Sequence, residues 1–127
     1  MKFLLDTHVF LWFINDSPNL KRDIADLLES DVELWLSIAS LWEIAIKVNL
    51  NKLTIPDNFK RFFPQQITLN NIEILPVTFE HLTVVANLPQ HHRDPFDRLL
   101  IAQAISEPIC LISADRQFDS YPINRRW

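Results

Sequence analysis

Glycine is missing from all 127 residues of the chain, and cysteine occurs once. Without glycine the chain has neither a Walker A loop nor a glycine-rich dinucleotide fingerprint, so both common types of nucleotide enzyme are excluded and we expect no nucleotide cofactor. A single cysteine permits no internal disulfide, as is usual in a reducing cytoplasm. Cys110 lies in the apolar run PICLIS, and we interpret it as a small core residue rather than a nucleophile.

Membrane-length hydrophobic runs are also absent. The opening stretch MKFLLDTHVFLWFI looks like a signal peptide, but Asp6 and His8 interrupt it and no small-residue cleavage site follows. The run is too short to cross a bilayer, so we expect a cytoplasmic protein without a membrane partner. Positive charge is scarce too, because the net charge of -4 argues against a broad basic surface for nucleic acid. If four acidic residues surround metal ions, the rest of the chain is formally neutral and local basic patches become feasible.

The chain that remains predicts one α/β domain over residues 1–127. Hydrophobic residues make up 48% and charged residues 22%, as in ordinary globular proteins. Strands are expected at 2–5, 33–37, 72–77, 109–113 and, at an edge, 123–127. Helices are expected at 16–30, 38–53, 56–67, 78–88 and 94–105. Nearly all-apolar strands that alternate with helices indicate a central parallel sheet of four to five strands, flanked by helices on both faces.

Local signals predict how some of these helices begin and end. Ser17 and Pro18 are the expected cap and first residue of the helix over 16–30. Thr78 is expected to open the helix over 78–88, and Pro64 is expected to end the helix over 56–67. The helix over 38–53 is expected to bury one apolar face, made of Ile38, Leu41, Trp42, Ala45 and Val48. The tryptophans and the phenylalanines near Phe62 are assigned to the core or to a dimer surface rather than to base stacking.

Four acidic residues fall at the edge of a parallel sheet where ligands bind, beyond the carboxyl ends of the strands. Asp6 follows the first strand, and Asp115 follows the fourth. Asp97 lies in the first turn of the helix over 94–105, and Glu43 lies about two turns into the helix over 38–53. Each has an ordinary explanation: a cap or turn for the three aspartates, and an ion pair with Lys47 for Glu43. Together these explanations require four carboxylates to meet at one edge by coincidence.

Carboxylates gathered in one cleft require a cation, because like charges at close range raise one another's pKa. Oxygen donors, with no usable cysteine and no paired histidine spacing, favour Mg²⁺ or Mn²⁺ over zinc. Such ions activate water and stabilise the leaving oxygen of an in-line displacement at phosphorus. The pattern therefore predicts phosphodiester hydrolysis.

Four motifs, LLDTH, SIASLWEIAIK, HRDPFDRLLIAQA and LISADRQF, occur in the order and near the spacing seen in PIN-domain proteins. The chain resembles the toxin ribonucleases of VapBC-type toxin–antitoxin pairs over nearly its full length. The resemblance implies a PIN-like fold, commonly a homodimer, with Mg²⁺- or Mn²⁺-dependent endoribonuclease activity on RNA. It also implies a cognate antitoxin whose C-terminal segment fills or blocks the acidic cleft, where an arginine would suit the carboxylates.

The resemblance also assigns roles to individual residues. The expected catalytic and metal-binding residues are Asp6, Glu43, Asp97 and Asp115. Hydroxyl residues that the family keeps near the site correspond to Thr7, Ser37 and Ser113. Asp94 is an additional carboxylate that we interpret as the cap of the helix over 94–105 and as a candidate outer group of the site.

Other polar residues flank these positions. The candidates for contact with RNA phosphates are Arg93, Arg98, Arg116 and Lys47, although a solvated surface charge is the more frequent use of such residues. His91 and His92 are suited to bind RNA or carry protons, and a simple loop position explains them equally well.

Two non-enzymatic alternatives compete with the nuclease. A signalling receiver domain needs an acidic pair after its first strand and an aspartate after its third, but here only Asp6 follows the first and Pro76 and Val77 follow the third. A receiver also needs a lysine after its last strand, and LISADRQ has none. A non-cleaving RNA- or protein-binding PIN-like module stays open, because the four carboxylates could equally hold a structural ion.

Overall fold

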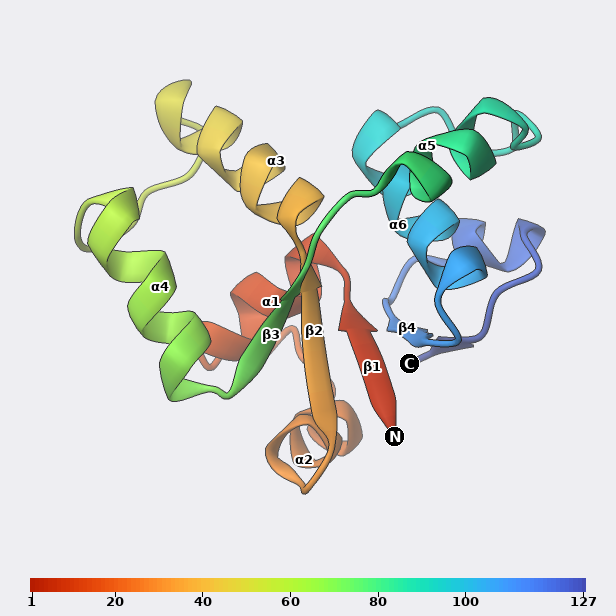
Figure 1. Ribbon diagram of the computed structural model, residues 1–127. Coiled ribbons are helices and arrows are strands. Elements are labelled where there is room, and N and C mark those ends of the chain that lie inside the picture. The colour runs from red at the N-terminus through yellow and green to blue at the C-terminus, as the bar shows by residue number, and fades with distance from the viewer.

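The computed structural model describes residues 1–127 as a five-stranded sheet with six α-helices (Figure 1). The elements run β1 (Lys2–Leu5), α1 (Thr7–Ile14), α2 (Arg22–Glu29), β2 (Glu33–Ser37), α3 (Ile38–Asn49), α4 (Phe59–Leu69), β3 (Ile72–Leu75), α5 (Phe79–Ala86), α6 (Pro95–Ser106), β4 (Cys110–Ile112), a 3₁₀ helix η1 (Arg116–Ser120) and β5 (Arg125–Arg126). The strands are ordered β3-β2-β1-β4-β5, and every neighbouring pair is parallel. The predicted α/β class is confirmed.

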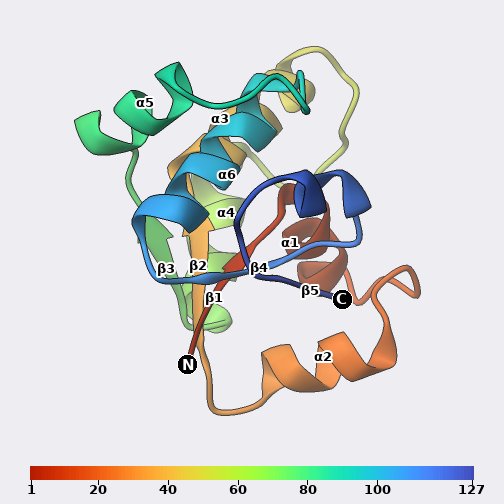
Figure 2. The same cartoon turned by 90° about the vertical axis from the view of Figure 1, so that its right-hand side faces the viewer.

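The two faces of the sheet carry separate hydrophobic cores. Successive side chains of a strand point to opposite faces. Phe3 and Leu5 accordingly pack in one cluster with residues of α1, α2 and α4, whereas Leu4 packs in the other with residues of α6 and η1. Figure 2 shows α1 and α2 on the opposite side of the strands from α5. Burial on both faces explains why the strands are nearly all apolar.

The order of the strands places a crevice beside β1. From β1 the chain moves outward through β2 to β3, then returns across the sheet to place β4 on the other side of β1. In open parallel sheets, ligands bind where the strand order reverses in this way, outside the carboxyl ends. The ends of β1 and β4 are held together there by a hydrogen bond from the Asp6 backbone N–H to the Ile112 carbonyl, 3.0 Å long.

A chain without glycine needs other residues wherever a helix ends in the left-handed conformation. Asp16, Asn51 and Asn71 have φ of 51°, 58° and 55°. Each follows the C-cap residue of a helix, namely α1, α3 and α4. Asparagine and aspartate tolerate this conformation better than other residues with a Cβ atom. Three helix ends that glycine often forms are therefore made by Asn and Asp.

Two predicted helix boundaries are wrong. Residues 7–14 form α1, for which no helix was expected, and the next helix starts at Arg22 rather than at Pro18. Ser17 caps no helix and accepts a hydrogen bond from the Asn19 backbone N–H at 3.2 Å. Pro64 does not end α4, which continues to Leu69. Pro64 lies on the exposed side, and so does Lys60, whose carbonyl loses its helical partner because proline has no N–H.

The predicted buried face of α3 is wrong in part: Leu41 and Val48 pack against the core, but Ile38 and Trp42 do not lie inward. Ile38 and Trp42 are 44% and 59% exposed, whereas Ala39, Ser40, Glu43 and Ile44 are buried. The helix ends at Asn49 instead of 53. Because α3 contacts both α1 and α6, it buries Ala39, Ser40 and Glu43 together with Ile44, and leaves its largest side chain, Trp42, exposed.

No helix reaches the length and hydropathy that a bilayer-spanning segment requires.

Candidate metal centre

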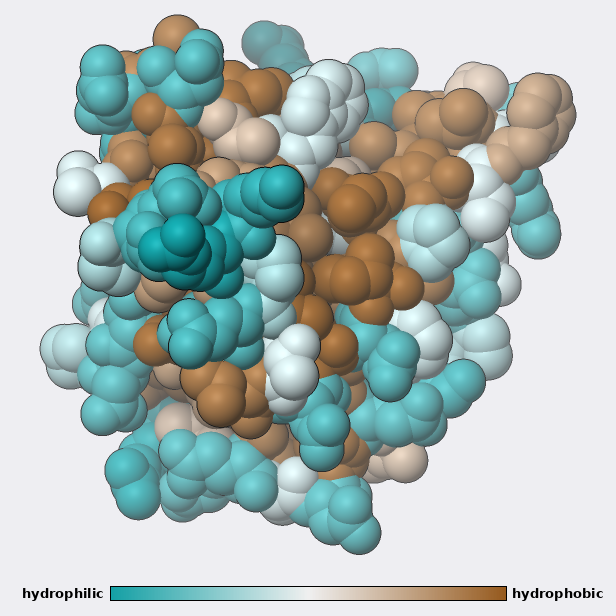
Figure 3. All heavy atoms as spheres, turned by 60° about the vertical axis from the view of Figure 1, so that its left-hand side comes forward, coloured by the Kyte–Doolittle hydropathy of each residue, from teal (hydrophilic) through white to brown (hydrophobic).

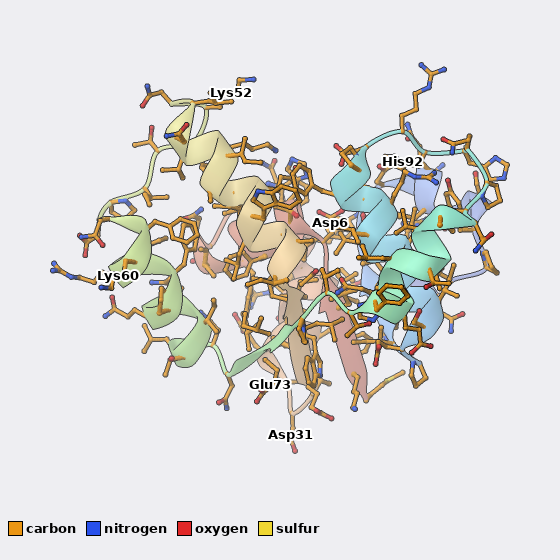
Figure 4. The ribbon with its side chains drawn as sticks, turned by 45° about the horizontal axis from the view of Figure 1, so that its top comes forward. Asp6, Asp31, Lys52, Lys60, Glu73 and His92 are labelled. Atoms are coloured by element: carbon orange, nitrogen blue, oxygen red, sulfur yellow. The ribbon has the colours of Figure 1, made fainter.

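Asp6 lies directly beyond β1 and uses its two carboxylate oxygens differently. Oδ1 accepts the His8 backbone N–H at 2.7 Å and so caps α1, whereas Oδ2 accepts the Ser113 hydroxyl at 2.7 Å. Burial raises the pKa of Asp6, but the hydrogen bonds from His8 and Ser113 outweigh burial and hold it below its usual value. Asp6 is therefore a buried carboxylate that stays ionised. In Figure 4 it lies between α3 and α6.

Asp97 lies in the first turn of α6, and its charge is poorly compensated. Its burial, together with the negative charges of Asp94, Asp6, Glu43 and Asp115, raises the pKa of Asp97 to about 7. Asp94 is the cap of α6 itself, whereas Asp6, Glu43 and Asp115 come from other elements of the chain. The raised pKa therefore shows that the fold brings the four predicted carboxylates within electrostatic reach of one another.

Asp115 follows β4 and faces a histidine. Its Oδ1 accepts the Gln117 backbone N–H at 2.9 Å, which caps η1. Its Oδ2 lies 3.6 Å from Nε2 of His92, and the same nitrogen lies 3.2 Å from Oδ2 of Asp97. One ligand atom from each of His92, Asp97 and Asp115 lies within 4.8 Å of the others. Sequence reasoning gave His92 no specific place here, because residues of a loop carry no periodic signal.

Glu43 enters the centre from α3. Its Oε2 lies 3.1 Å from Nζ of Lys47, so the expected ion pair forms. The pair is not fully at the surface, because the Glu43 side chain is only 11% exposed, although that of Lys47 is 35% exposed. Glu43 is near enough to raise the pKa of Asp97 through its charge. Lys47 partly neutralises the cluster from its outer side.

The three predicted hydroxyl residues have different partners. Ser113 links two of the acidic residues, because its Oγ donates to Asp6 and accepts the Asp115 backbone N–H at 3.1 Å. Thr7 donates to Oγ of Ser40 at 2.9 Å and thereby joins α1 to α3. Ser37 caps α3 by accepting the Ala39 N–H at 3.1 Å. Only Ser113 contacts a carboxylate directly.

Asp94 caps α6, as predicted. Its Oδ1 accepts the backbone N–H groups of Phe96 at 2.9 Å and Asp97 at 3.1 Å. Its charge also contributes to the raised pKa of Asp97. Asp94 therefore lies behind the centre and also adds to its negative potential.

The candidate RNA-binding cations differ in exposure. Arg93 and Arg116 are exposed. Arg98 is buried, and its guanidinium donates to backbone carbonyls of the preceding loop, including those of Pro89 and His92, both at 3.0 Å. Both terminal nitrogens of the guanidinium are thus bonded within the fold, so Arg98 is not a phosphate contact and that prediction is wrong.

A hollow of about 370 Å³ opens at this edge of the sheet. Its lining includes Asp6, Ser113 and Asp115, with His8 and Trp12 of α1 on the other side. The centre has four carboxylates but only one lysine beside them, so it offers several oxygen ligands and a net negative charge. This donor set fits a hard divalent cation, and the raised pKa of Asp97 is the response expected of such a cluster without one.

A protein-family model described as the PIN domain matches residues 3–124. Among solved structures, VapBC2 from Rickettsia felis, bound to a DNA fragment from its promoter, matches with a TM-score of 0.73 and 19% identity, covering 99% of this chain and 98% of the other. DNA-bound VapBC from Salmonella typhimurium matches with a TM-score of 0.71 and 20% identity over 99% and 97% of the two chains. VapBC-5 from Mycobacterium tuberculosis, a member of the VapBC family of toxin–antitoxin systems, matches with a TM-score of 0.61 and 20% identity over 98% of both chains. No curated protein matches the sequence.

Proposed function

The chain belongs to the PIN domain family, and from this premise we propose that it is a metal-dependent endoribonuclease, the toxin of a toxin–antitoxin pair. The family membership confirms the resemblance that the four sequence motifs indicated. One observation carries the proposal of chemistry: Asp97 lies within 4.8 Å of Asp115 and His92, and burial, its neighbour Asp94 and the charges of Asp6, Glu43 and Asp115 raise its pKa to about 7. Repulsion within such a cluster destabilises the folded chain, and binding of a cation offsets that repulsion.

In this proposal Asp6, Glu43, Asp97 and Asp115 hold one or two ions of Mg²⁺ or Mn²⁺. Bound there, the cation would lower the pKa of a water molecule and offset negative charge on the phosphate. The chain's own residues provide the geometry. Ser113 fixes the relative positions of Asp6 and Asp115, and Lys47 limits the charge of Glu43. Hydrolysis would then form a bond from the water oxygen to phosphorus as the P–O bond to the leaving oxygen breaks; the water gives up a proton and the leaving oxygen takes one up, so the RNA chain is cleaved.

The RNA contacts are proposed for exposed cations at the rim. Arg93 precedes α6 and Arg116 begins η1, so both are exposed neighbours in sequence of the acidic residues Asp94 and Asp115. Lys47 reaches the same centre from α3. Positive side chains beside an acidic cleft bind phosphates and position the substrate without reading its sequence.

The proposed partners are an antitoxin and a second copy of the chain. Three structurally similar proteins are VapBC complexes, which supports a cognate antitoxin that covers the cleft in the cytoplasm. A homodimer is supported by a groove of about 350 Å³ lined only by hydrophobic residues, namely Ile38, Ala39, Trp42, Val77, Leu82 and Leu99. Figure 3 shows that hydrophobic residues gather into a band on one face of the molecule. An apolar surface of this kind usually marks an interface.

The direct test is cleavage of RNA by the Asp6→Asn variant. The substitution keeps an oxygen that can cap α1 but removes the charge, so cleavage in Mn²⁺ is expected to fall to the level seen with chelator. Asp31→Asn is the matched control, because Asp31 is exposed and lies at the lower edge of the molecule in Figure 4, away from Asp6. It is expected to cleave RNA like the wild-type protein.

Activity retained by Asp6→Asn would contradict the assignment of Asp6 to the catalytic centre. A wild-type protein that binds RNA but cuts none of it in single-turnover assays would instead support the non-cleaving PIN-like module.

A further inference from the structure

His92 presents a buried nitrogen to the acidic cluster. The residue is 7% exposed, and its Nε2 has no partner with hydrogen-bond geometry. Two carboxylate oxygens nevertheless lie close to it, Oδ2 of Asp97 at 3.2 Å and Oδ2 of Asp115 at 3.6 Å. Since a buried polar atom without a partner is destabilising, this nitrogen requires an explanation.

The other ring nitrogen determines what Nε2 can do. Nδ1 of His92 accepts the backbone N–H of Asp94 at 3.3 Å. A nitrogen that accepts a hydrogen bond carries a lone pair, so in the neutral ring the hydrogen sits on Nε2. An Nε2–H cannot ligate a metal, but it can donate to carboxylates. The backbone of Asp94 therefore selects the tautomer in which His92 donates toward Asp97 and Asp115.

The backbone on both sides of the ring is held in place. The His92 N–H donates to the Tyr121 hydroxyl at 2.8 Å, and that hydroxyl donates to the Pro89 carbonyl at 2.9 Å. Arg98 donates to the His92 carbonyl at 3.0 Å, and the imidazole packs against Phe118 with ring centroids 5.6 Å apart. A buried arginine and a buried tyrosine thus fix one loop residue, as expected where a side chain must point in a definite direction.

We propose that His92 is a positioning residue of the metal centre: when a cation draws the cluster together, its Nε2–H donates to Oδ2 of Asp97, 3.2 Å away, and so directs the other oxygen of Asp97 toward the cation. The inference rests on the proposed function, because it takes this carboxylate to be a metal ligand. Donors behind metal ligands set ligand orientation, and removing one typically weakens metal binding about 10- to 100-fold.

The test is the Mn²⁺ affinity of the purified protein, measured without RNA from the EPR signal of free Mn²⁺. His92→Leu removes the donor and is expected to raise the dissociation constant about 10- to 100-fold. His92→Gln, whose amide N–H reaches the place of Nε2, is expected to stay near the wild-type affinity. His92→Asn, whose amide reaches only the place of Nδ1, is expected to lose affinity as His92→Leu does. His91→Leu, at the exposed neighbouring residue, is the control and is expected to bind normally.

Two failures are distinguishable. A wild-type protein that binds no Mn²⁺ would contradict the metal centre itself, and the role of His92 with it. Wild-type affinity in both His92→Leu and His92→Asn would overturn the role of His92 and leave the metal centre standing. Pulsed EPR adds a further check, because a coupling typical of a directly bound imidazole nitrogen that disappears in His92→Gln would make His92 a ligand instead.

Discussion

At the scale of single residues, capping a helix and serving the acidic centre prove compatible. Asp6 and Asp115 each cap a helix with Oδ1, which leaves Oδ2 directed at the centre. Asp97 has no such second duty, because Asp94 is the cap of α6. Capping signals in a sequence therefore do not argue against a ligand role. Of the four carboxylates, Asp97 is the one that neither caps a helix nor pairs with a lysine, and it is also the one whose pKa is strongly raised.

The raised pKa of Asp97 predicts how stability changes with pH in the absence of metal. Between the ordinary value of 3.8 and about 7, the folded chain keeps a proton that the unfolded chain releases. Stability from this proton is present at low pH and is lost as pH rises toward 7. In chelator, wild-type unfolding free energy should fall by up to about 3 kcal/mol more than that of Asp97→Asn between pH 5 and pH 8. Urea denaturation at the two pH values measures the unfolding free energy of each protein. The same pH dependence in both would contradict the claim that burial and neighbouring charges raise the pKa of Asp97.

At the scale of elements, the strands and several caps could be predicted from the sequence. The strands are short apolar runs. The side chains of the predicted caps Thr78 and Asp94 accept hydrogen bonds from backbone N–H groups in the first turns of their helices. The acidic residues could also be placed at one edge, since parallel strands put their carboxyl ends together. Local patterns determine these features, so local reasoning recovers them.

The remaining elements depend on contacts that no local pattern encodes. Residues 7–14 are apolar nearly all round, and α1 forms because it is covered by the sheet, α3 and Trp127 rather than because it has a polar face. Likewise Trp42 stays largely exposed and packs edge-on against Phe96, with ring centroids 5.0 Å apart, while Glu43 turns inward. The roles of His92 and Arg98 arise from a loop whose path is set by residues far along the chain.

The loop between α5 and α6 gives a prediction at this scale. Arg98 donates to the carbonyls of Val85, Leu88, Pro89 and His92 at 3.0 to 3.5 Å. Arg98→Met leaves these buried carbonyls without their donor and is expected to lower the unfolding free energy by about 3 kcal/mol. The exposed Arg93→Met should change it by less than about 0.5 kcal/mol. Equal stability of the two variants in urea denaturation would show that the loop does not depend on Arg98.

At the scale of the whole molecule, two surfaces beyond the carboxyl ends of the strands differ in what they expose. The crevice at the carboxyl ends collects negative charge, while the apolar groove between α3 and α5 exposes Trp42 and Leu82, which are 59% and 50% accessible. Charge in one place and apolar surface in another suit separate partners. We therefore expect the cleft to bind RNA or the antitoxin, and the groove to bind a second copy of the chain.

The proposed dimer is tested by placing a charge in the groove. Trp42→Glu should convert a dimer to a monomer in light scattering after size-exclusion chromatography, because an unpaired carboxylate is costly to bury at an apolar interface. Leu69→Glu is the matched control, since Leu69 is 70% exposed on α4, outside the groove, and should leave the dimer intact. A wild-type protein that is monomeric throughout the accessible concentration range would remove the homodimer from the proposal.

The central claim is that the carboxylates converge in order to hold a cation, and thermal melts of wild type and Asp97→Asn, each in chelator and in Mn²⁺, test it most directly. The account predicts that Mn²⁺ raises the melting temperature of the wild-type protein. At a hundredfold excess over the dissociation constant, the free energy of unfolding should rise by about 2.7 kcal/mol. Asp97→Asn should be more stable than wild type in chelator and should lose most of the response to Mn²⁺. The contrary result is that Mn²⁺ changes neither protein, while Asp97→Asn loses the ~0.3–1 kcal/mol typical of a carboxylate in the first turn of a helix.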